Sequence, residues 1–211
     1  MSAADARDRY FESLDHIDSA YTKIKGMVGR NGALTFPDVY KLTEGLFLNS
    51  WTYWEAFLRD VIWNDLATDA TGVLLSDMAI KGKRTNGAYR LAELILNHPD
   101  SPDKFVEWSD YSVVRKRAMA LLSAGNRFTT PPPQLQDIEK LKRIRNAIAH
   151  KSDRAWDSFI SLATSAPFGL TSIQTRGLTP GRFLYAHMWS GNTVMDTASA
   201  TLRQAALTIV P

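Results

Sequence analysis

The apolar residues of this chain recur every three or four positions over long stretches, with polar residues between them. That spacing places the apolar side chains on one side of an α-helix, whereas a half-buried strand would show strict alternation. Glycine, proline and asparagine interrupt the pattern and mark where helices end. The pattern predicts an all-α protein, a single domain over residues 1–211, with helices at about 3–28, 36–66, 88–97, 113–123, 134–150 and 180–207.

Two features are expected between these helices. The stretch 161–180 is rich in Ser, Thr, Gly and Pro and predicts a small β-hairpin near residues 172–178. The polar run 151–154 predicts a basic loop, after which Trp156 and Phe159 return to the core.

The stretch 134–150 carries the most informative pattern. Three prolines at 131–133 precede it, and a helix starts readily after such a run but does not pass through it. With Ile144 facing the core, a rotation of about 100° per residue leaves Arg145 on the flank and turns Asn146 and His150 away from the core. The helix therefore presents a polar patch opposite one apolar stripe, which consists of Leu135, Ile138, Leu141, Ile144 and Ile148.

Composition narrows the possible chemistry. With 45% apolar and 22% charged residues, the chain is expected to be a soluble globular protein. It has no cysteine, which excludes disulfides, thiolate zinc sites and cysteine nucleophiles and is expected of a cytoplasmic protein. The polar N-terminus does not have the pattern of a signal peptide, and no apolar run reaches the length of about eighteen residues expected of a membrane span. We therefore expect no membrane partner.

Charge is concentrated beside the polar patch. The whole chain has a net charge of only +3, but residues 140–154 contain six basic residues and one acidic residue, a local net charge of +5. Lys142, Arg143, Lys151 and Arg154 are therefore candidate contacts to the phosphate backbone of a ligand. A solvated helix face built from good helix formers explains the same run without any ligand.

The sequence Arg-Asn-Ala-Ile-Ala-His at 145–150 resembles the Arg–(four to six residues)–His motif of HEPN-domain proteins, in the form with Asn directly after Arg. The segment 49–60 is similar to the second helix of the HEPN branch named for its association with RNA ligase and phosphatase genes, RiboL-PSP. The resemblance covers about residues 36–157. It implies an up-and-down bundle of four to five core helices with short extra helices, paired as a homodimer and using no metal or other cofactor.

Many HEPN proteins are endoribonucleases, and the residue types in the motif suit that reaction. His150 can remove the proton of a ribose 2′-OH, Arg145 can stabilise charge developing on the phosphate, and Asn146 can hold the ring or a phosphate oxygen. The family pattern also has an acidic residue near the motif, for which Glu55 is the candidate. The resemblance thus implies a metal-independent endoribonuclease, a toxin or antiviral-defence effector, that leaves 2′,3′-cyclic phosphate ends. A dimer would supply the second histidine needed as the acid.

Other interpretations stay open. Asn, His and Lys are favourable in the last turn of any helix, and Glu55 is equally well explained as a surface acid. The alternative function is a non-catalytic HEPN-type module that binds RNA, a nucleotide, or a protein such as an antitoxin or a defence-complex member. Metal and serine hydrolase chemistry are disfavoured, because the chain has no Gly-x-Ser-x-Gly motif and no metal-binding spacing among His16, His98, His150 and His187.

Overall fold

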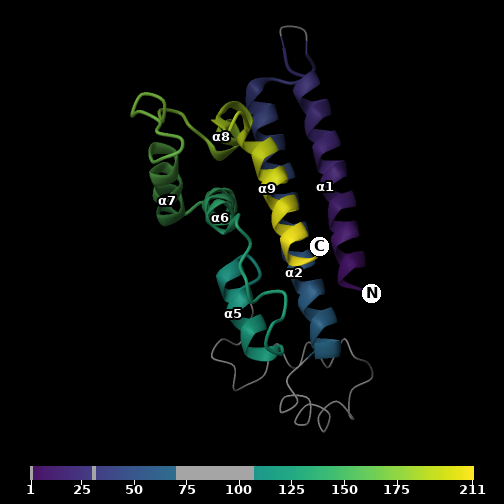
Figure 1. The fold of residues 1–211 in the computed structure, drawn as a ribbon. Coiled ribbons are helices and arrows are strands. Elements are labelled where there is room, and N and C mark those ends of the chain that lie inside the picture. Colours follow the sequence, from purple (N-terminus) through teal and green to yellow (C-terminus); the bar gives the residue numbers. More distant parts are fainter. Residues whose placement is uncertain (1, 30–31, 70–106) are drawn as a thin grey trace. The chain divides into compact units, whose positions relative to one another are not determined.

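The computed structural model describes residues 2–29, 32–69 and 107–211, and these residues are predominantly helical, as the spacing of apolar residues predicts (Figure 1). The predicted helix 88–97 lies outside the described residues. No helix in the described part of the chain is both long and apolar enough to cross a membrane. The described elements are α1 (Ala3–Gly26), α2 (Phe36–Asp69), α5 (Tyr111–Leu121), α6 (Leu135–His150), α7 (Asp153–Thr164), α8 (Pro180–Ala186), β1 (Met188–Trp189), β2 (Asn192–Thr193) and α9 (Val194–Ile209).

The chain forms two compact units, and α1, α2 and α9 contribute residues to both. The first unit contains Met1–Tyr10, Trp54–Pro133 and Ala206–Pro211. The second contains Phe11–Tyr53 and Gln134–Ala205. The expectation of one domain over residues 1–211 stays a prediction.

The core of the first unit is aromatic. Buried Tyr10 of α1 stacks on Phe57 of α2, with ring centroids 5.2 Å apart. Arg127, which follows α5, donates a hydrogen bond to buried Asp65 at 2.7 Å and another to the carbonyl of Ile209 at 3.3 Å. One guanidinium therefore ties together segments that are far apart in the sequence.

The second unit packs α6, α7, α8 and α9 with parts of α1 and α2. Asp18 of α1 accepts hydrogen bonds from Ser199 at 2.9 Å and Arg203 at 3.1 Å, which holds α9 alongside α1. Phe159 of α7 and Phe183 of α8 are fully buried and meet edge to face, with centroids 5.4 Å apart. Helices α7 and α8 also pack against α6.

The start of α8 is held directly against α2. The backbone N–H of Gly181 donates to the buried carboxylate of Glu44 at 3.0 Å, and Lys41 pairs with the same carboxylate at 2.7 Å. A Cβ atom at position 181 would lie 2.1 Å from the backbone carbonyl oxygen of Tyr40. Only glycine fits there, because the clash is with backbone and no side-chain rotation relieves it.

Two predictions for the C-terminal part are wrong. No hairpin forms at 172–178: residues 172–177 make consecutive turns, stabilised by a hydrogen bond from the Thr171 N–H to Gln174 Oε1 at 2.8 Å. The predicted helix 180–207 is instead α8, the β1–β2 hairpin and α9. The break occurs because Ser190 and Gly191, with φ angles of 53° and 90°, form the two-residue turn typical of tight hairpins.

We expect Gly181→Ala to destabilise the protein by about 1–3 kcal/mol, because the new methyl group overlaps backbone atoms of α2. Chemical denaturation measures the loss. Gly45→Ala is the matched control: Gly45 also lies in a helix, and a Cβ added there meets nothing within 4 Å. That substitution should raise stability by about 0.5–1 kcal/mol. Equal effects of the two substitutions would contradict the close contact at Gly181.

A second prediction concerns pH. Burial, and to a lesser extent the charge of Arg182, lowers the pKa of His187 below its ordinary value of 6.5. The folded state therefore resists protonation of His187 more than the unfolded chain does. The contribution of His187 to stability is complete above pH 6.5 and is lost as the pH falls through the lower folded pKa.

His187→Gln should accordingly weaken the loss of stability between about pH 7 and pH 5, measured by urea denaturation at each pH. His16→Gln, at an exposed histidine of α1, is the control and should leave the slope unchanged. A His187→Gln protein with the wild-type slope would show that the prediction is wrong.

Candidate functional site

Helix α6 places the polar patch where the sequence predicts. It runs Leu135–His150, beginning just after the prolines at 131–133. Its stripe is buried, apart from Leu135, which is half-buried: Ile138, Leu141, Ile144, Ala147 and Ile148 face the core. On the other side Arg145 and Asn146 are partly buried and His150 is exposed. The apolar stripe therefore anchors the helix and leaves these three side chains outside the core.

Arg145, Asn146 and His150 form one hydrogen-bonded group. Nη1 of Arg145 lies 3.1 Å from Oδ1 of Asn146 and 3.1 Å from Nε2 of His150. A guanidinium only donates, so Nε2 is the acceptor in this contact. In the described part of the chain Arg145 is the hydrogen-bond partner of the ring, and no carbonyl of the last turn of α6 takes that role. This geometry disfavours the interpretation of His150 as a simple helix cap.

The connection from α6 to α7 is only two residues long. Lys151 has left-handed backbone angles, φ 47° and ψ 29°, which end α6. Ser152 accepts a hydrogen bond from the N–H of Ala155 at 3.3 Å and so caps the start of α7. The predicted basic loop over 151–154 is therefore wrong after Ser152, since Arg154 lies in the first turn of a helix. The sequence held the signal, because serine followed by aspartate is a common helix start.

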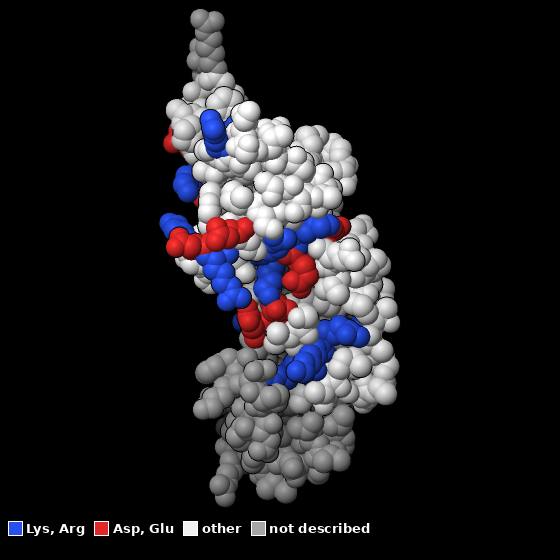
Figure 2. Space-filling model, turned by 90° about the vertical axis from the view of Figure 1, so that its left-hand side faces the viewer, with Lys and Arg blue, Asp and Glu red and all other residues white. Residues whose placement is uncertain are grey.

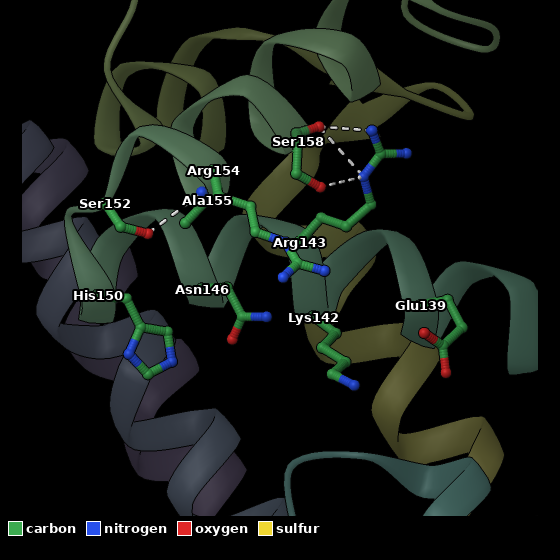
Figure 3. Close-up of a pocket in the computed structure, with 9 residues that line it drawn as sticks. All are labelled: Glu139, Lys142, Arg143, Asn146, His150, Ser152, Arg154, Ala155 and Ser158. Atoms are coloured by element: carbon green, nitrogen blue, oxygen red, sulfur yellow. Dashed lines mark hydrogen bonds between the residues drawn. The ribbon is translucent and has the colours of Figure 1, made fainter.

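Helices α6 and α7 enclose a recess of about 400 Å3 (Figure 3). Three cationic side chains line it against one carboxylate, that of Glu139, so the lining is basic. His150 and Asn146 lie at one end of the drawn row of side chains and Glu139 at the other (Figure 3). The full lining is Glu139, Lys142, Arg143, Asn146, His150, Ser152, Arg154, Ala155 and Ser158.

Arg143 has a structural task in this recess. Its Nε donates to the carbonyl oxygen of Ser158 at 3.1 Å and to the hydroxyl of the same residue at 3.0 Å (Figure 3). The bonds fasten α7 to α6. The guanidinium is thereby held at the recess wall with a fixed direction, while its charge still contributes to the field inside.

The structure brings most of the predicted site residues together. Lys142, Arg143 and Arg154 share the recess with Asn146 and His150. Arg145 reaches the group through its bond to the His150 ring.

Two predicted site residues, Lys151 and Glu55, do not line this recess. Lys151 lines a different recess, on the other side of the α6–α7 turn. Glu55 is half-buried on α2 and belongs to the first compact unit, so its supporting role stays a prediction.

Four lining residues were missed from the sequence: Glu139, Ser152, Ala155 and Ser158. Glu139 precedes Asn146 by seven positions, two helical turns, so it lies on the same face of α6 and the spacing alone could have identified it. Nothing in the sequence predicted that Ser158 faces Arg143, because that contact depends on how α7 packs.

The basic character is local. On the face drawn in Figure 2, Lys and Arg side chains are interspersed with Asp and Glu side chains in the middle of the view. The recess itself is distinguished by its concave shape and by the excess of three cations over one carboxylate in its lining.

No protein-family model matches the chain, and no curated protein or solved structure matches it either. Among the described residues, no three His, Asp or Glu side chains are grouped as a metal site would require.

The left-handed Lys151 leads to a stability prediction. A residue with a Cβ is strained in this conformation and glycine is not, so Lys151→Gly should stabilise the protein by about 0.5–1 kcal/mol. Lys151→Ala is the control, since it removes the same charge but keeps the Cβ and should give no such gain. Thermal denaturation of the three proteins tests the prediction, and a gain with alanine as large as with glycine would contradict it.

Proposed function

We propose that this protein is a metal-independent endoribonuclease of HEPN type that acts as a homodimer, with Arg145, Asn146 and His150 as catalytic residues. The observation that carries the proposal is the 3.1 Å contact between Arg145 and His150 beside a basic recess of about 400 Å3. A titratable group and a planar cation at one site are what cleavage next to a phosphate requires. The bundle architecture expected of the family is part of the same proposal.

The reaction follows from the roles of these groups. Arg145 moves its donors from Nε2 to the oxygens of the bound phosphate, which frees the Nε2 lone pair. His150 then removes the proton of the 2′-OH, the O2′–P bond forms and the P–O5′ bond breaks. A second acid protonates the departing 5′-oxygen, and the products are a 2′,3′-cyclic phosphate and a 5′-hydroxyl. The amide nitrogen of Asn146 can donate to a phosphate oxygen, because its Oδ1 is held by Arg145.

Pairing of two copies completes the site. Among the described residues that line the recess, His150 is the one histidine. Strand cleavage needs a base and an acid at the same phosphate, so a second copy of His150 would supply the missing group. Such an enzyme suits a toxin or antiviral-defence effector in the cytoplasm, restrained by a protein partner such as an antitoxin.

The test is incubation of the purified full-length protein with mixed-sequence RNA in EDTA. We expect the wild type to produce cyclic-phosphate ends and His150→Ala to lower the cleavage rate roughly 10²–10⁴-fold, the usual contribution of a general base. His16→Ala is the matched control, because it removes an exposed histidine of α1 and should leave cleavage unchanged. Circular dichroism and sedimentation verify the fold and the oligomeric state of each protein.

Two outcomes would count against the proposal. Equal cleavage by wild type and His150→Ala would place the activity elsewhere. Tight RNA binding without turnover, by a folded dimer, would instead favour a non-catalytic RNA-binding module.

A further inference from the structure

A second recess lies on the other side of the α6–α7 turn. It has a volume of about 320 Å3 and is formed by the end of α6, the start of α7, α2 and the residues that begin α8. Ser152 lines both recesses, so the two are neighbours across this turn. A chain that leaves the basic recess past Ser152 reaches the second one directly.

The lining of the second recess includes the exposed aromatic side chain of Trp156. Of the six tryptophans in the chain it is the only one among the large exposed apolar residues, with 40% of its surface accessible. Its ring packs against buried Phe159, with centroids 5.5 Å apart. The indole is therefore supported from within the protein and presents its remaining surface to the recess and to solvent. A rigid, half-covered aromatic ring is a suitable platform for a planar ligand.

The charges of the second recess differ from those of the first. Lys41 and Lys151 are balanced by Glu44 and Asp153, and Glu44 is already bound by Lys41 and by a backbone N–H. A lining with no net charge does not favour a phosphate. An uncharged base that stacks on an aromatic ring and forms hydrogen bonds at its edge fits this lining better.

We propose that the second recess binds an unpaired nucleobase of the RNA strand whose backbone occupies the basic recess, and that Trp156 stacks on this base. The proposal rests on RNA being the ligand of the site described above. Trp156 is then a specificity-determining residue that favours single-stranded RNA, since a paired base must first be unpaired and unstacked before it can stack on the indole. The Ser152 and Thr179 hydroxyls and the Asp153 carboxylate offer partners for the edge of the base.

Binding without cleavage tests the proposal. In the His150→Ala protein, the affinity for a fluorescent single-stranded RNA is measured by anisotropy, with and without Trp156→Ala. Loss of one stacked base should weaken binding roughly 5- to 100-fold. Trp156→Phe is the control, since it keeps an aromatic face and should bind within about threefold of the parent. Duplex RNA of the same sequence should bind equally well to the parent and to Trp156→Ala.

Photocrosslinking adds a direct readout. An RNA carrying 5-iodouridine should crosslink to the tryptic peptide 155–176, whose one tryptophan is Trp156. Crosslinking to other peptides only would overturn the assignment, as would unchanged affinity in Trp156→Ala or an equal loss for duplex RNA. Dissociation of the dimer by Trp156→Ala in sedimentation would also overturn it, by showing that the indole serves an interface.

The test of the base site and the test of the proposed nuclease can fail independently. If the wild type cleaves RNA and Trp156→Ala has no effect on binding, the proposed base site is wrong and the proposed nuclease stands. If binding depends on Trp156 but the wild type does not cleave RNA, the proposed nuclease is wrong and the proposed base site stands.

Discussion

The two-residue connection between α6 and α7 is the constraint on which the rest of the site depends. So short a link forces α7 to turn back against α6, and the left-handed Lys151 provides the necessary reversal of direction. The hydrogen bonds from Arg143 to Ser158 then fix the two helices side by side. Without this arrangement Arg154 would not face Asn146 and His150, and the polar side of α6 would be an open surface with no recess.

The same turn separates two environments of different charge. On one side, three cations and one carboxylate line a recess beside His150. On the other, two lysines and two acids line a recess beside an exposed indole. A nucleic acid strand has the same division between a charged backbone and uncharged bases. The proposals that the basic recess binds phosphate and that the second recess binds a base therefore agree with the charges of the two linings.

Part of the wall of the second recess is formed by α2 and the start of α8, which are far from α6 in the sequence. Lys41, Glu44 and the start of α8 belong to both the recess and the contact at Gly181, where α8 touches the backbone of α2. A substitution that pushes α8 away would change the recess as well as the stability. Stability and the proposed base site are therefore coupled, and each variant of this region needs a check of its fold.

Much of the site could be read from the sequence. The apolar period alone established α6, its buried side, and the position of Arg145, Asn146 and His150 on the other side, because helical geometry is local and repeats every 3.6 residues. Local rules also account for two features that the prediction lacks: the serine that caps α7 and the Ser190–Gly191 turn that interrupts the last predicted helix.

Tertiary packing alone decided the rest. The sequence placed six basic residues in one run, but it could not show that Lys151 lies apart from Lys142 and Arg154, since their separation depends on the direction that α7 takes. Trp156 was expected in the core from its apolar character, yet it remains 40% exposed because the core contact of α7 is made by Phe159 one turn later. Local sequence determines which face a residue occupies, and only the packing of one helix on another determines what that face meets.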